Sequence, residues 1–267
     1  MTAETPPTDI EPAISFHYYD RHPTLEDLMG ESVAQDWLLN YLIDLLQRHY
    51  RDEPVFVARN LNIYTARVAK QYPVAPDLAL FRDVSIPRAR LRRLRSWRMY
   101  EPDRPPPQLV LEVASDSTWP NDLNDKPTRY GELGVQEYIF YDPNEPQEIP
   151  GARLRVWRYP DGRPELVPPD TTGRVWSNAL TSWIVPDTAM LRLIDGDGKR
   201  WSSTAEAERV ARLAAQRARR ETQLARREAE AAREDQAVER TAKEAERTAK
   251  EAAWERLRQL GVDPETL

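Results

Sequence analysis

Apolar side chains recur every three or four positions along residues 31–50, which form the first clear periodic pattern in the chain. The apolar members of this pattern are Val33, Trp37, Leu38, Tyr41, Leu42, Leu45 and Leu46. Side chains at these spacings share one face of an α-helix. The pattern therefore predicts an amphipathic helix over residues 31–50 that packs through this face.

Four later segments are rich in β-branched and aromatic residues, and each predicts extended structure. They are residues 54–65, expected as one strand or two short ones, and residues 74–81, 108–115 and 137–143. Residues 127–133 predict a short helix, because Pro127 suits a first turn and Gly134 suits a helix end. A hairpin is expected around Asp161-Gly162, followed by irregular Trp-containing segments to about residue 200. This order of elements predicts an α/β fold.

The C-terminal part of the chain has a different character, with no Pro or Gly between residues 203 and 259. The heptapeptide ERTAKEA occurs twice in tandem, at 239–245 and 246–252. A seven-residue period is typical of a coiled coil, although large apolar residues fill few positions of the expected seam. A coiled coil that joins two copies and a single solvated helix with Glu–Lys and Glu–Arg pairs both remain open.

Length and composition favour one domain with an appendage. The chain has 267 residues, no cysteine and a net charge of −6. We expect a disordered segment at 1–15, one domain at 16–200 and a charged helix or coiled coil at 203–260.

The absence of cysteine excludes disulfides and thiolate chemistry and fits a reducing cytoplasm. No segment suits a membrane span, and the acidic balance means that nucleic acid would need a local basic patch.

Two carboxylates stand out against this background. Glu112 lies in LVLEVAS, where Leu109, Leu111 and Val113 share one face of the expected strand and Glu112 falls on the other. A buried carboxylate requires a cation, a metal or hydrogen bonds. Asp77 begins a neighbouring apolar strand, directly after Pro76. Carboxylates on adjacent strands can hold magnesium, which uses one or two protein carboxylates and several waters; a salt bridge at Glu112 and a turn at Asp77 are the structural alternatives.

The order of these motifs resembles a known family. PDLAL, LVLEVASDST, the spacing from Asp122 to Lys126 to Tyr130, GVQEY at 134–138 and YDP at 141–143 are together similar to the Uma-type restriction endonuclease family. That family is part of the PD-(D/E)XK nuclease superfamily, and the similarity covers roughly residues 24–195. It implies a restriction-endonuclease-like mixed central sheet flanked by helices, followed here by the long C-terminal helix.

The resemblance also implies an activity, which is metal-dependent endonucleolytic cleavage of DNA with Mg²⁺ or Mn²⁺. Asp77, Glu112 and the Val113 carbonyl would bind the metal ion. The superfamily lysine expected two residues after the glutamate is replaced by Ala114, and Lys126 is the candidate for its role. Gln35, Asp122 and Tyr130 are candidate supporting residues. The alternative is a catalytically inactive module on the same fold that binds nucleic acid or another protein.

An arginine-rich segment connects the two motif strands. Residues 88–98 contain the candidate nucleic-acid contacts Arg88, Arg90, Arg92, Arg93, Arg95 and Arg98. Guanidinium groups bind phosphate well, and such contacts are independent of base sequence. We expect this segment to emerge near the carboxylates and to contact DNA. The alternative is a solvated insertion whose charges pair with acidic residues.

Overall fold

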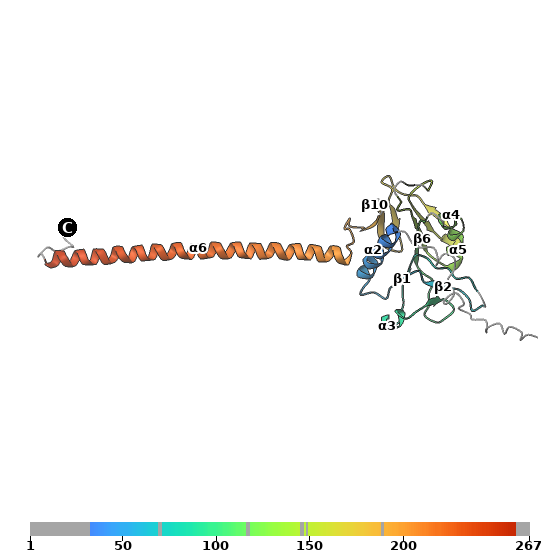
Figure 1. The fold of residues 1–267 in the computed structure, drawn as a ribbon, viewed down its shortest axis with the longest axis horizontal. Coiled ribbons are helices and arrows are strands. Elements are labelled where there is room, and N and C mark those ends of the chain that lie inside the picture. Colours follow the sequence, from blue (N-terminus) through green and yellow to red (C-terminus); the bar gives the residue numbers. More distant parts are fainter. Residues whose placement is uncertain are drawn as a thin grey trace, which may run out of the picture. The chain divides into compact units, whose positions relative to one another are not determined.

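The computed structural model describes residues 33–68, 71–115, 118–144, 147, 149–187 and 190–259, and the segment expected to be disordered at 1–15 lies outside them. The chain forms two compact units that divide between Ala205 and Glu206. The first unit contains all of the strands that the structure describes (Figure 1).

A six-stranded sheet with the order β1-β3-β5-β6-β7-β8 forms the centre of the first unit. Its strands are β1 (Phe56–Arg59), β3 (Leu78–Phe81), β5 (Leu109–Val113), β6 (Glu137–Tyr141), β7 (Leu154–Arg158) and β8 (Glu165–Val167). Only the β5–β6 pair is parallel; the other four pairs are antiparallel. The sheet is therefore mixed, as the family resemblance implied, and β7 and β8 form the expected hairpin around the 3₁₀ turn Pro160–Gly162.

Helices cover both faces of this sheet, and α2 and α5 lie on opposite sides of β6 in Figure 1. Helix α2 (Val33–His49) packs Leu38, Leu42 and Leu45 onto the face that carries Leu111 and Val113. Helices α4 (Trp119–Asn124) and α5 (Lys126–Leu133) follow β5 along the chain. Tyr130 and Leu133 of α5 pack onto the opposite face, which carries Val110 and Ala114. The alternation expected along β5 is thus confirmed.

A second, three-stranded antiparallel sheet lies in the region expected to be irregular. It consists of β9 (Val175–Ser177), β10 (Ser182–Asp187) and β11 (Met190–Asp195), with β10 in the middle. Its apolar face, which includes Val175, Ile184 and Leu193, joins the core formed with α2. The expectation of irregular structure was wrong, because three short strands gain their stability from this shared core rather than from a strong local pattern.

The arginine-rich insertion between β3 and β5 contains the short helix α3 (Arg88–Leu91) and β4 (Ser96–Arg98). Strand β4 pairs in parallel with β2 (Asn62–Tyr64) in a separate two-stranded sheet. Trp97 is fully buried and packs against Phe56 and Phe81. The insertion is therefore anchored by one aromatic side chain, while most of its arginines are exposed.

The second unit consists of most of helix α6 (Thr204–Gln259), whose described side chains are almost all exposed. Pairs of opposite charge spaced four residues apart run along it, including Lys243–Glu239 and Arg240–Glu244. Such pairs stabilise an isolated helix by a few tenths of a kcal/mol each, about 0.2–0.5. None of the described helices, α6 included, combines the length and the apolar character needed to cross a membrane.

Candidate active site

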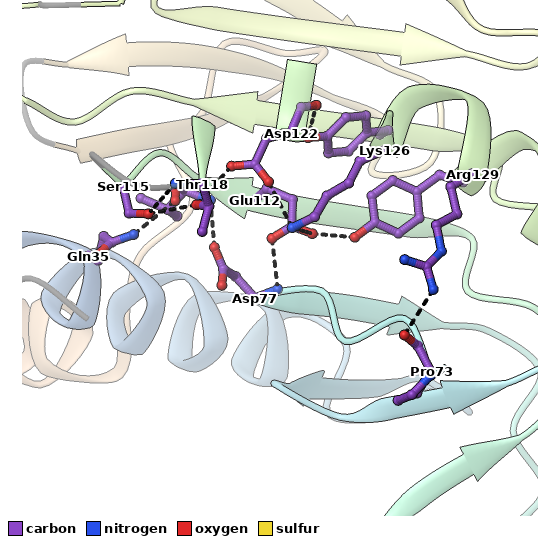
Figure 2. A network of polar contacts seen from close by, with 12 residues as sticks. Gln35, Pro73, Asp77, Glu112, Ser115, Thr118, Asp122, Lys126 and Arg129 are labelled. Atoms are coloured by element: carbon purple, nitrogen blue, oxygen red, sulfur yellow. Dashed lines mark hydrogen bonds and ion pairs between the residues drawn. The ribbon is translucent and has the colours of Figure 1, made fainter. Parts of the chain in front are cut away.

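Asp77 and Glu112 meet because of the register between their strands. Strands β3 and β5 are antiparallel with Leu78 opposite Leu111, so the start of β3 lies beside the end of β5. The Asp77 backbone N–H donates to Glu112 Oε2 at 3.3 Å, and the Val113 N–H donates to Asp77 Oδ2 at 2.7 Å. Two acids that are 35 residues apart in the chain are thereby brought to one edge of the sheet (Figure 2).

Glu112 is only 2% exposed, and α5 supplies two of its hydrogen-bond donors. Lys126 Nζ lies 2.9 Å from Glu112 Oε1, and the Tyr130 hydroxyl donates to the same oxygen. Lys126 and Tyr130 are four residues apart, so they lie on one face of α5. A carboxylate has about four lone-pair positions, and three of those on Glu112 are engaged here. The remaining one is on Oε2, the oxygen that also contacts Asp77.

Asp122 of α4 is a third acid in this cluster, and it is 1% exposed. Its Oδ1 lies 2.8 Å from Lys126 Nζ, and its Oδ2 accepts a hydrogen bond from the Thr118 hydroxyl at 3.3 Å. The Tyr138 hydroxyl donates to the Asp122 carbonyl at 2.8 Å, which fixes the backbone at this point. Lys126 is consequently held between two carboxylates, as Figure 2 shows.

The cluster carries more negative than positive charge. Asp77, Glu112 and Asp122 oppose the single ammonium of Lys126, which leaves two negative charges uncompensated when all four groups are ionised. Burial, and then the charge of Glu112, raises the pKa of Asp77 well above its ordinary value. Burial and Glu112 likewise raise the pKa of Asp122 to about 6.

Lys126 stays protonated in this setting. Burial on its own lowers the pKa of Lys126, but the neighbouring Glu112 and Asp122 outweigh burial and raise it above the ordinary value. The Tyr130 pKa is raised well above its ordinary value by burial and by Glu112, so its hydroxyl remains a donor. The cluster therefore contains two fixed proton donors that point at Glu112 and two carboxylates with strengthened proton affinity.

Helix α2 reaches the same edge of the sheet through Gln35. This side chain is 5% exposed, and its Nε2 donates to the Val113 carbonyl at 2.9 Å. A carbonyl oxygen has two lone pairs, so one on Val113 remains for another partner. Gln35 thus contacts the backbone beside Glu112.

The donor set fits a hard divalent cation. Asp77, Glu112 and the Val113 carbonyl all offer oxygen, and the excess of two negative charges equals the charge of one such ion. In the described part of the chain, no three His, Cys, Asp or Glu side chains are grouped so that they could hold a metal ion. An ion here would use two carboxylates, one carbonyl and several waters, which is a common arrangement for magnesium.

The arginine-rich insertion does not emerge beside these carboxylates, so that expectation was wrong. Leu80 pairs with Leu109, and the Gln108 N–H donates to the Leu80 carbonyl. Residues 82–108 therefore leave and rejoin the sheet at the end of β3 opposite to Asp77. The length of this strand, about 3.3 Å per residue, separates the insertion's attachment points from the carboxylates. The sequence suggested proximity because the insertion joins the two motif strands. It does not show at which end of these strands the insertion leaves the sheet.

Two contributors to the site were not anticipated. Thr118 donates to Asp122 and contacts Ser115 Oγ at 2.6 Å, and the Ser-x-x-Thr spacing after β5 could have indicated this turn. Arg129 donates to the carbonyls of Tyr72 and Pro73, which tethers α5 to the segment leading into Asp77 (Figure 2). No sequence signal distinguished Arg129 from a solvated helix residue.

The mixed sheet, with an acid at the start of one strand and a second acid near the end of its neighbour, is the arrangement that the resemblance to PD-(D/E)XK nucleases implied. The chain belongs to the Uma2 family, described as "Putative restriction endonuclease", whose family model matches residues 16–186. Membership supports a nuclease-like function. No curated protein matches the chain.

Among solved structures, the chain is similar to a crystal structure described as a putative nuclease belonging to DUF820 from Anabaena variabilis ATCC 29413. The two are 14% identical, the match covers 60% of this chain and 74% of the other, and the TM-score is 0.38. At this level the likeness carries no argument about the present chain.

Proposed function

We propose that the chain is a metal-dependent endonuclease that hydrolyses DNA phosphodiester bonds with Mg²⁺ or Mn²⁺. One observation carries the proposal, namely the buried cluster in which Lys126 pairs with Glu112 and Asp122 while Asp77 adds a third carboxylate close to Glu112. A buried net charge of this size is costly unless protons or a cation compensate it. A divalent cation compensates it while keeping the carboxylates ionised.

Asp77, Glu112 and the Val113 carbonyl are the proposed ligands. A bound divalent ion would make a water more acidic and neutralise charge on the scissile phosphate. Two hydrogen bonds from backbone to side chain hold the pair in place, since the Asp77 N–H donates to the Glu112 carboxylate and the Val113 N–H donates to the Asp77 carboxylate. Gln35 orients the Val113 carbonyl through its hydrogen bond.

Lys126 is the proposed catalytic lysine, and Asp122 and Tyr130 are proposed positioning residues. The Lys126 ammonium reaches Glu112 from α5, where it can orient the attacking water and stabilise negative charge on the phosphate oxygens. Asp122 holds the ammonium from the other side. Tyr130 restricts the Glu112 carboxylate through its hydroxyl. Attack of water forms the new phosphorus–oxygen bond and releases a proton to solvent, while the bond to the leaving deoxyribose oxygen breaks and that oxygen takes up a proton from solvent.

Arg88, Arg90, Arg92, Arg93, Arg95 and Arg98 are the proposed DNA contacts. Five of them are exposed, and Arg98 is half-buried and paired with Glu101. Since they lie toward the far end of β3, DNA that reaches the carboxylates must extend along the sheet to meet them. Their contribution is sequence-independent affinity that falls as salt rises.

A catalytically inactive module that binds nucleic acid or another protein is the second candidate. The observation in its favour is that protein donors already engage three lone-pair positions of Glu112. A homodimer through α6 is compatible with either candidate. In the nuclease it would bring two sites to opposite DNA strands.

Cleavage of supercoiled plasmid separates the two candidates. Wild type should nick the plasmid with Mg²⁺ or Mn²⁺ and not with a chelator, and Asp77→Asn and Glu112→Gln should each lose this activity. Asp197→Asn, which changes an exposed carboxylate in a turn, is the matched control and should retain it. Absence of metal-dependent cleavage by folded wild type would favour the inactive module.

A further inference from the structure

A small cavity lies between the C-terminal end of α2, the start of β1 and the arginine-rich insertion. Its volume is about 160 Å³, and its lining includes Gln47, Tyr50, Val55, Phe56, Arg88 and Arg92. The cavity is separate from the carboxylate cluster and shares none of its residues. It combines an apolar and aromatic wall with two guanidinium groups.

Several arginines of the insertion that borders this cavity have no acidic partner among the described residues. Within the described residues, Arg90, Arg92, Arg93 and Arg95 make no hydrogen bond or ion pair through their side chains. The nearby acids are already engaged, since Asp52 pairs with Arg51 and Glu53 pairs with Arg82. The insertion therefore presents several free guanidinium groups in one short stretch, which suits an anionic ligand with more than one charge.

Contacts with the rest of the first unit hold Arg88, Phe56 and Tyr50 in the cavity wall. Arg88 Nη2 donates to the Arg51 carbonyl at 2.5 Å, which holds α3 against the end of α2. Phe56 stacks with Phe81 and Trp97, and Tyr50 lies under the Arg82 guanidinium at 4.6 Å from its ring centre. A ligand ring would therefore enter a preformed site and order little of the protein on binding.

The size of the cavity matches one ring. An apolar cavity of about 150 Å³ takes up benzene, so 160 Å³ accommodates a single heteroaromatic ring. A base in a duplex is stacked and paired on both sides, so only an unpaired base could place its ring here. Phosphate groups on either side of that nucleotide would then lie within reach of the Arg88 and Arg92 side chains at the rim.

We propose that this cavity binds one unpaired nucleotide of a nucleic acid strand, with its base against Val55, Tyr50 and Phe56 and its phosphate beside Arg88 and Arg92. The choice of nucleic acid as the ligand rests on the proposed nuclease function. The cavity would give the protein a preference for single-stranded or locally opened substrate.

Fluorescence anisotropy with a labelled twelve-residue oligothymidylate and a duplex of the same length tests the proposal. The measurement uses the full chain with a chelator present, so that cleavage plays no part. Wild type should bind the single strand about tenfold more tightly than the duplex, the effect expected from one base contact. Equal affinity for the two probes overturns the proposal.

Two variants that leave the charge unchanged identify the cavity as the source of the preference. Val55→Phe fills the cavity from within, and Gln47→Trp covers its rim from an exposed helix position that tolerates substitution. Both should lose the tenfold preference and keep the duplex affinity. If both folded variants retain the wild-type preference, the cavity does not bind the base.

Arg92→Ala tests the phosphate contact, with Arg163→Ala on the exposed β7–β8 turn as the control. Arg92→Ala should reduce the slope of log affinity against log salt by about 0.7 for the single strand, and Arg163→Ala should leave it unchanged. Equal slopes in the two variants remove Arg92 from the site. Plasmid nicking is measured separately, so failure of the nuclease proposal appears as lost cleavage with the strand preference intact.

Discussion

The ammonium of Lys126 lies 2.9 Å from Oε1 of Glu112, and so a lysine on α5 contacts the glutamate of the central strand. The superfamily pattern places its lysine on the strand itself, where this chain has Ala114. Ala114 is 1% exposed and is packed in the core with Tyr130 and Phe140. The ammonium beside Glu112 therefore comes from α5 and not from the position of Ala114.

Replacing Lys126 with methionine should destabilise the protein by about 3 kcal/mol at neutral pH. Breaking a buried ion pair leaves a buried charge without a partner, which typically costs about 3–5 kcal/mol; here both Glu112 and Asp122 lose their cation. Urea denaturation measures the change. Lys243→Met, which breaks an exposed pair on α6, should cost less than about 1 kcal/mol. Similar losses in both variants would contradict this assignment.

Tyr130→Phe should cost about 2 kcal/mol, because it removes a buried hydrogen bond to a charged group. Tyr159→Phe is the matched control. The Tyr159 hydroxyl is buried and has no hydrogen-bond partner in the described structure, so its removal should cost little or should stabilise the protein. Thermal and urea unfolding of the two variants compare them directly. A smaller loss for Tyr130→Phe than for Tyr159→Phe would show that the hydroxyl does not stabilise Glu112.

Local patterns predicted the strands and helices of this cluster except α4, which carries Asp122. Glu112 was identifiable because it interrupts a strand that is apolar on both faces. Asp122, Lys126 and Tyr130 were identified only through the resemblance to the Uma-type family. The positions of the arginines could not be inferred from the sequence. They depend on the antiparallel register of Leu80 with Leu109, which places the insertion at the strand ends opposite to Asp77 and Glu112. The β9–β11 sheet was missed because its stability depends on packing against α2, which no local pattern encodes.

Magnesium or manganese should stabilise the wild-type protein against thermal unfolding. An ion at one hundred times its dissociation constant contributes about 2.7 kcal/mol to the folded state. Asp77→Asn should abolish this gain. It should also raise the melting temperature in a chelator, because it removes a carboxyl group whose pKa is raised by burial and then by repulsion from Glu112. Asp197→Asn should respond to the metal as wild type does. An unchanged metal response in Asp77→Asn would exclude Asp77 as a ligand.

The metal-free protein should lose stability relative to Asp122→Asn as the pH rises from 4 to 7. The folded-state pKa of Asp122 is about 6, against an ordinary value of 3.8. A raised carboxyl pKa stabilises the folded state below the unfolded pKa, and this contribution disappears as the pH rises through 6. The difference between the two proteins should change by on the order of 2 kcal/mol. A constant difference across this range, measured by urea denaturation in a chelator, would contradict a raised Asp122 pKa.

Helix α6 carries Val210, Leu224 and Val238 at intervals of two heptads, and all three are more than half exposed in the single chain. Side chains 14 residues apart fall on one face of a supercoiled helix, so a second copy could cover all three together. If the homodimer forms through this face, Leu224→Glu should convert it to monomer, because a charge at a seam position disrupts the packing of both helices.

Thr222→Glu introduces the same charge two residues away, about 200° around the helix, and should leave the dimer intact. Sedimentation equilibrium of the full chain across the micromolar range measures each association constant. Equal weakening by both substitutions would point to net charge rather than the seam as the cause. A wild type that stays monomeric throughout would identify α6 as a single solvated helix held by its ion pairs, which are spaced closely enough to stabilise it alone.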